Sequence, residues 1–99
     1  MTIRKELNDG KLMLAPEGRL DTTTSPDLEA EIEASCDGIS ELLLDFAGLR
    51  YLSSAGMRVL LSAQQKANAE GFTMSLTNVN EEVMEVFDMT GFSSFLTII

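Results

Sequence analysis

The chain contains no histidine, a single cysteine and few basic side chains among its 99 residues. Without histidine it cannot form a His-based catalytic triad, and it lacks the commonest general base and the commonest zinc ligand of proteins. Cys36 has no partner for an internal disulfide, as is usual in a reducing compartment. No Gly-rich phosphate-binding loop occurs either. We therefore expect a protein with no catalytic residues, metal site or cofactor of its own.

Long apolar runs and a secretory leader are also missing. No segment approaches the roughly 20 apolar residues that span a bilayer, and no cationic stretch with an apolar run behind it opens the chain. The 16 acidic and 7 basic residues give a formal charge of −9, which disfavours nucleic acid and anionic membranes as partners. We expect a cytoplasmic protein without membrane insertion or nucleic-acid binding, whose partner presents a basic or neutral face.

The residues that are present suit one α/β domain over 1–99, with 44% hydrophobic and 23% charged residues. Two strands, Ile3 to Leu7 and Lys11 to Glu17, flank an Asn-Asp-Gly sequence and predict a hairpin. Pro16 and Gly18 are expected to end the second strand. The first strand should therefore be antiparallel to the second.

A helix is predicted next, with Ser25 as its N-cap and Pro26 at its first position. Its apolar stripe comprises Leu28, Ile32, Ser35 or Cys36, and Ile39. The opposite face is acidic, and solvation explains that face better than docking does.

The remainder alternates strands and helices. The run Leu42 to Leu44, within a strand Glu41 to Phe46, is typical of a strand buried on both faces of a parallel sheet. The elements after it are a helix from about Ser54 to Ala69 that Gly71 stops, a strand around Met74, a helix capped by Asn78 or Asn80 and broken by Gly91, and a last strand from Phe95 to Ile99. The predicted fold is a mixed sheet of about five strands, antiparallel at first and then mostly parallel, with about three helices in the order ββαβαβαβ.

Two serines stand at the start of the second predicted helix, where Ser53 or Ser54 would cap it. In open α/β sheets, binding sites gather outside the carboxyl ends of the strands. A right-handed βαβ unit brings the loop with Asp21 and the loop with Ser54 to the same edge of the sheet. By themselves the serines are more typical of a simple cap than of a site, and Asp21 could simply form an Asx-turn.

The stretch from Leu42 to Leu61 is more specific than its caps. Its order is an apolar strand, Asp45, a connector with Gly48, an aromatic-Leu pair, Ser-Ser-Ala-Gly-Met and Val-Leu-Leu. This order resembles the signature of the STAS domain of bacterial anti-sigma-factor antagonists. Upstream, Gly18-Arg19-Leu20-Asp21 is similar to the Gly-x-Leu-Asp loop of that family. The resemblance covers nearly the whole chain.

The resemblance implies a binding switch rather than an enzyme. In that family the serine two residues before the glycine, here Ser54, is phosphorylated by a serine kinase that is itself the anti-sigma factor, and a protein phosphatase reverses the modification. The unmodified form binds the anti-sigma factor and releases sigma. Many members carry Asp where this chain has Ser53, so Ser53 is the alternative acceptor. The residues expected to contact the partner are Asp21, Thr22, Ser53, Ser54, Gly56, Met57 and Arg58.

Two other functions are compatible with the pattern. A stand-alone domain of the same fold could be the accessory subunit of a lipid-transporting ATPase, with Ser54 in the docking surface. A receiver-like protein could accept a phosphoryl group on Asp45, although the paired acids and the late-strand lysine of such a site are missing. Arg50 and Arg58 are solvent-exposed by default or contact a partner's acid or nucleotide. Met57 and Met89 are candidates for an apolar contact patch.

Overall fold

The chain opens with the predicted hairpin. In the computed structural model, which describes residues 1–99, β1 (Thr2–Asn8) is antiparallel to β2 (Lys11–Leu20), with Asn8 opposite Lys11. Asp9 and Gly10 between the strands both have positive φ, as a two-residue hairpin turn requires.

The second strand is longer than predicted because a β-bulge lets it continue beyond Pro16 and Gly18. Pro16 and Gly18 do not end β2, which runs on to Leu20. At Gly18, with a φ of 95°, the register shifts, and the Gly18 N–H donates to the Gly48 carbonyl at 2.9 Å. Beyond the bulge β2 pairs in parallel with a short strand that we did not predict, β4 (Leu49–Leu52). One strand thus serves β1 and β3 before its bulge and β4 after it.

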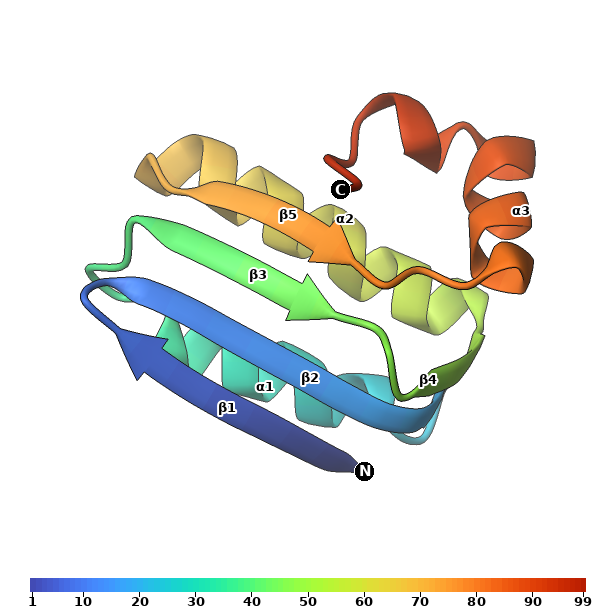
Figure 1. Ribbon diagram of the computed structural model, residues 1–99, viewed down its shortest axis with the longest axis horizontal. Coiled ribbons are helices and arrows are strands. Elements are labelled where there is room, and N and C mark those ends of the chain that lie inside the picture. The colour runs from blue at the N-terminus through green and yellow to red at the C-terminus, as the bar shows by residue number, and fades with distance from the viewer.

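After β2, the strands β3 and β5 are added one after the other on the same side of the sheet. Its order is β1-β2-β3-β5, with β3 (Glu41–Asp45) and β5 (Thr73–Thr77) parallel to β2, and β4 beside the end of β2. Parallel crossovers are right-handed, so α1 (Ser25–Ser35) and α2 (Ser54–Glu70) both fall on the same face of the sheet, as Figure 1 shows. The carboxyl ends of β2, β3 and β5 consequently point to one end of the molecule.

The core lies between the sheet and the helices, because α1 and α2 cover only one face of the sheet. Leu42 and Leu44 of β3 are buried under the helices, whereas Leu43 between them is half-buried on the face that no helix covers (Figure 1). The prediction that β3 is buried on both faces is therefore wrong. The core is one cluster of 22 buried residues.

The helix boundaries follow their caps, with one shift. Thr24 occupies the N-cap of α1, and Ser25, predicted as the cap, is the first helical residue and is buried. Leu28 and Ile32 of the predicted stripe are buried on α1, whereas the helix ends at Ser35, so the buried Cys36 is its C-cap and Ile39 lies beyond it. The second helix ends at Glu70 with Gly71 in the left-handed conformation, as predicted.

The end of the chain differs from its prediction. Following α3 (Glu81–Thr90), the turn η1 (Phe92–Ser94) folds back, and Phe95 to Ile99 forms a single bridge between Ile98 and Leu76 instead of a strand. The Phe92 and Phe95 rings pack with their centroids 4.6 Å apart, which favours a turn over an extended chain. The fold class and the numbers of strands and helices, five and three, are confirmed. The predicted order is wrong: the observed order is ββαββαβα, with β4 added and the predicted last strand absent.

Candidate functional site

The start of α2 is fixed to the sheet by Ser53. This residue is extended, and its Oγ accepts a hydrogen bond from the Gly56 N–H at 3.5 Å. Its own N–H donates to the Leu20 carbonyl at 2.9 Å, which ties the entry of α2 to the end of β2. Ser53 is half-buried. It therefore serves as the helix cap, and its hydroxyl and backbone are both engaged.

Ser54 has a different environment one residue later. It is the first residue of α2, it is exposed, and its hydroxyl makes no hydrogen bond within the protein. The free amides of a first helical turn carry partial positive charge, and the first turn of α2 contains no acidic residue. The structure thus presents the Ser54 hydroxyl to solvent beside a positive helix end.

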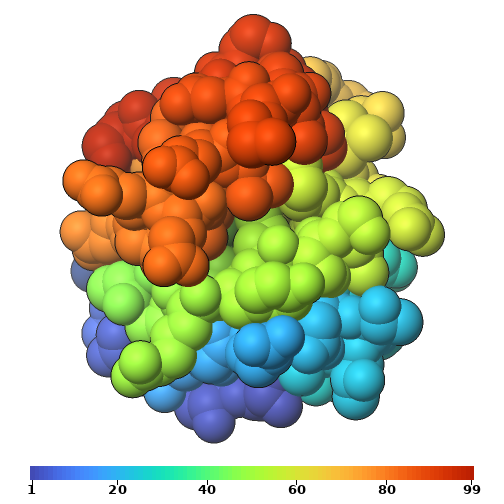
Figure 2. All heavy atoms as spheres, turned by 90° about the vertical axis from the view of Figure 1, so that its right-hand side faces the viewer, coloured from blue at the N-terminus to red at the C-terminus, as the bar shows by residue number.

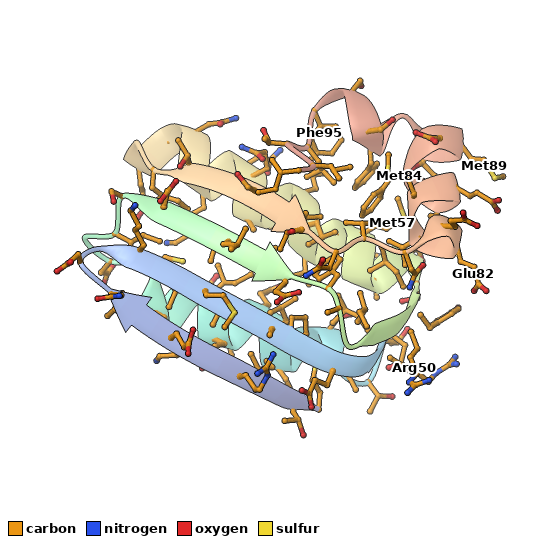
Figure 3. The ribbon with its side chains drawn as sticks, viewed as in Figure 1. Arg50, Met57, Glu82, Met84, Met89 and Phe95 are labelled. Carbon is orange, nitrogen blue, oxygen red and sulfur yellow. The ribbon has the colours of Figure 1, made fainter.

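Two of the three contact residues predicted after the serines, Gly56 and Met57, lie beneath the surface. Gly56 is buried, and a Cβ at this position would come within 2.6 Å of Leu52 Cδ1 and 2.9 Å of Leu20 Cγ. Only glycine lets α2 approach β4 and β2 this closely. Met57 is only 8% exposed and points from α2 toward α3 (Figure 3). Both residues support the site from below and offer almost no surface to a partner.

The loop after β2 is organised by Asp21. Its Oδ1 accepts from the Thr23 N–H at 3.0 Å and from the Thr24 N–H at 3.2 Å, and Arg19 Nε lies 3.7 Å from its Oδ2. The pKa of Asp21 is lowered, chiefly by the hydrogen bond from the Thr24 N–H. Such a donor favours the ionised carboxylate. Asp21 therefore forms the Asx-turn considered from the sequence and leaves Thr22 exposed at the tip.

The topology brings this loop and α2 together, as expected. The bond between Leu20 and Ser53 joins their backbones, and Thr22, Ala55 and Arg58 line one shallow hollow of about 280 Å³ between the starts of α1 and α2. Figure 2 faces this end of the molecule, where β4 and the start of α2 form a yellow-green band between orange α3 and the blue loop after β2. Of the residues predicted to contact a partner, Thr22 and Arg58 line this hollow together.

Three arginines lie at this end of the molecule, on β2, β4 and α2. Arg19 stacks on the Tyr51 ring, with its guanidinium carbon 4.1 Å from the ring centroid. Arg50 and Arg58 are exposed and form no ion pair. Arg50 extends from β4 away from the body of the protein (Figure 3). The predicted pair of Met57 and Met89 does not form a patch, since Met57 is buried and Met89 is 85% exposed.

A second set of contacts at this end was not predicted. Asn78 has a φ of 57°, and its Nδ2 donates to Asp45 Oδ1 at 3.0 Å, an oxygen that also accepts from the Ala47 N–H. The Asn78 amide is the main cause that lowers the pKa of Asp45. Asn80 caps α3 through Val83 and donates from Nδ2 to the carbonyl of Leu49 at 3.1 Å. The two asparagines in the β5–α3 connector were a signal for these contacts, but the sequence did not show what they would reach.

Asp45, at the end of β3, consequently binds the β5–α3 connector and does not lie in an acidic pocket. No group of three or more His, Cys, Asp or Glu side chains in the structure could hold a metal ion. No helix combines the length and the apolar character needed to cross a membrane.

Comparison with known proteins gives consistent matches along the whole chain. A model of the STAS domain matches residues 2–99. BtrV of Bordetella bronchiseptica, which carries the name of an anti-sigma factor antagonist, is 35% identical over 100 residues, covering 99% of this chain and 85% of the relative. A crystal structure of an anti-sigma factor antagonist from Mycobacterium paratuberculosis superposes with a TM-score of 0.87 at 23% identity, over 98% of this chain and 83% of that one. The Bacillus cell fate determinant SpoIIAA in its phosphorylated form superposes with a TM-score of 0.77 at 17% identity, over 99% and 91% of the two chains.

Proposed function

The chain belongs to the STAS domain family, and we propose that it is an anti-sigma factor antagonist whose docking is switched off by phosphorylation of Ser54. The similarity to BtrV over nearly the full chain supports the antagonist role. The phosphorylated form of SpoIIAA, a protein of the same fold, supports control by phosphorylation. In the proposal the partner is an anti-sigma factor with serine kinase activity, a phosphatase restores the free serine, and all three act in the cytoplasm.

The observation that carries the proposal is the contrast between the two serines. Ser53 uses its hydroxyl to cap α2 and its N–H to hold β2, whereas Ser54 is exposed and unbonded. A kinase needs an accessible hydroxyl oxygen. That oxygen bonds to the γ-phosphorus of ATP on the kinase, the bond to ADP breaks, and the hydroxyl proton passes to a base of the kinase. The Ser53 hydroxyl is half-buried and already accepts from the Gly56 N–H, which makes the exposed Ser54 the better acceptor.

The size of the effect can be bounded from the charge. A phosphoserine carries about two negative charges at neutral pH. At about 6 Å and an effective dielectric constant near 20, one pair of like unit charges costs on the order of 3 kcal/mol, which corresponds to about a hundredfold in affinity. Repulsion against an acidic group of the partner would therefore suffice to stop docking without refolding the domain.

The test combines modification and binding. The wild type, Ser54→Ala and Ser53→Ala are incubated with the cognate kinase and ATP, and phosphate is mapped by mass spectrometry. We expect incorporation at Ser54 in the wild type and in Ser53→Ala, none in Ser54→Ala, and about a hundredfold weaker binding of the phosphorylated wild type in calorimetry. Modification at another residue, or equal affinity of the two forms, would contradict the proposal. Stable binding to the nucleotide-binding subunit of a transporter, unaffected by Ser54, would favour the accessory-subunit alternative.

A further inference from the structure

The basic side chains are distributed unevenly over the protein. Five of the seven lie 2.8–3.7 Å from a carboxylate, namely Arg4, Lys5, Lys11, Arg19 and Lys66. The two without an ion pair are Arg50 and Arg58, which flank the serines in sequence. In a chain with 16 acids, two unpaired arginines at the same end indicate a surface that keeps its cations available for an anion from elsewhere.

Arg58 has the geometry to serve Ser54 itself. The two residues are four apart on α2, so their side chains are neighbours on one helix face. Helical side chains lean toward the N-terminus, which places the Arg58 side chain over the turn that contains Ser54. Arg58 also lines the hollow with Thr22 and Ala55. The first turn of α2 contains no acidic residue, and Glu29 of α1, which lines the same hollow, forms no ion pair with Arg58.

We propose that Arg58 is the phosphate ligand of this site and that, in the phosphorylated protein, its guanidinium binds the phosphate of Ser54 within the same helix. This inference rests on the proposed function, since it concerns the modified form of Ser54. A guanidinium offers two parallel N–H donors that match two phosphate oxygens. In the unmodified protein the same guanidinium is free to bind an acidic group of the partner.

The consequence is a switch that acts on the surface in two ways. Phosphorylation adds an anion at the docking face, and it also withdraws a cation that the partner would otherwise contact. The second effect needs no repulsion from the partner, and it operates where the partner presents an acidic group to Arg58. The intramolecular pair also holds the phosphate against α2, near the amides of its first turn.

Arg50 provides a matched control because it has the same charge and a different neighbourhood. It lies on β4 and lines a separate hollow with Asn80, Glu81 and Glu82. No residue of α2 lines that hollow, and Figure 3 shows Arg50 and Glu82 at the same end of the molecule. We assign no role in phosphate binding to Arg50.

The experiment measures the phosphate directly and does not depend on the kinase. Phosphoserine is incorporated at position 54 during translation, and its second pKa is followed by ³¹P NMR titration in the wild-type, Arg58→Gln, Arg58→Lys and Arg50→Gln backgrounds. A bound cation lowers that pKa below the ordinary value of about 6. We expect Arg58→Gln to raise it by about 0.2–0.4 pH unit, Arg58→Lys to raise it by less, and Arg50→Gln to leave it unchanged.

The outcomes separate this inference from the proposed function. Equal pKa values in wild type and Arg58→Gln, or an equal shift in Arg50→Gln, would overturn the assignment of Arg58 as the phosphate ligand, even if phosphorylation still abolished docking. A shift confined to the Arg58 variants would support it, even if the phosphorylated protein bound the anti-sigma factor as well as the unmodified one. In that last case the proposed function alone would fail.

Discussion

The helices α2 and α3 are built alike at both ends, yet their first turns have opposite character. Each is capped by a side-chain oxygen that accepts from the third helical N–H, Ser53 for α2 and Asn80 for α3, and each ends at a left-handed glycine. Glu81 and Glu82 occupy the first turn of α3, whereas the first turn of α2 contains no acid. The positive end of α3 is thus compensated within the chain, and that of α2 is left for an anion from outside.

The third helical position differs as well. In α3 it is Val83, which is 3% exposed and reaches into the core with its side chain. In α2 it is Gly56, whose backbone lies against Leu52 and Leu20. The Val83 side chain separates the α3 backbone from the core, whereas Gly56 lets the α2 backbone contact the strand residues directly. This close approach keeps Ser54 beside the Asp21 loop.

The largest predicted effect concerns this close approach. Gly56→Val should destabilise the protein by about 3 kcal/mol, because the added methyl groups would overlap Leu52 and Leu20 in a packed core. Urea unfolding gives the free energy. The same side chain placed two residues earlier, in Ser54→Val, should change stability by less than about 0.5 kcal/mol because this position is exposed. Similar losses in the two variants would contradict the packing argument.

The caps should also prove unequal. Asn80→Ala removes the cap bond at 2.9 Å and the bond to the Leu49 carbonyl at 3.1 Å, and should cost about 2 kcal/mol. Ser53→Ala removes one bond of 3.5 Å and should cost about 0.5 kcal/mol. Thermal or urea unfolding of both variants measures the difference. The reverse order would show that α2 depends more on its cap than the geometry indicates.

The two helices also show what the sequence could and could not predict. Their limits were predicted because caps such as Asn80 and Gly71 act on their own helix. The strand β4 was missed because its four residues find their partner only beyond the bulge at Gly18, a pairing between segments far apart in the chain. The bare face at Leu43 was mispredicted for a related reason, since coverage depends on the direction in which strands are added.

The site divides in the same way. The shared edge of Asp21 and Ser54 followed from topology. The burial of Met57, and the absence of ion partners at Arg50 and Arg58, depend on distances between side chains from different elements. No local pattern in the sequence reports such distances.

Charge in the first turns should have a smaller and opposite effect on the two helices. Ser54→Glu should stabilise the protein by about 0.5 kcal/mol because it places an anion at the uncompensated end of α2. Glu81→Ser should destabilise it by a similar amount, since it removes such an anion from α3. Both changes should shrink when unfolding is repeated at high salt, which screens exposed charges. Destabilisation by Ser54→Glu would show that the start of α2 is not open to an anion.

The smallest predicted effect tests the connection between the two helix entries through Asp45 and Asn78. The pKa of Asp45 is lowered from the ordinary value of 3.8 by the Asn78 amide first and then by the Ala47 N–H. A carboxylate with a depressed pKa in the folded state stabilises the protein above its unfolded pKa, and this contribution is lost as the pH falls through the lower, folded value. We therefore expect the unfolding free energy of the wild type to fall as the pH drops below 3.8, and Asp45→Asn to show a shallower fall over the same interval. Asp88→Asn changes an exposed carboxylate of α3 that accepts no hydrogen bond. In this variant the unfolding free energy should fall with decreasing pH as steeply as in the wild type. If instead Asp88→Asn flattened this fall as much as Asp45→Asn, the acid sensitivity would arise from the overall charge and not from the bond that joins the approaches to α2 and α3.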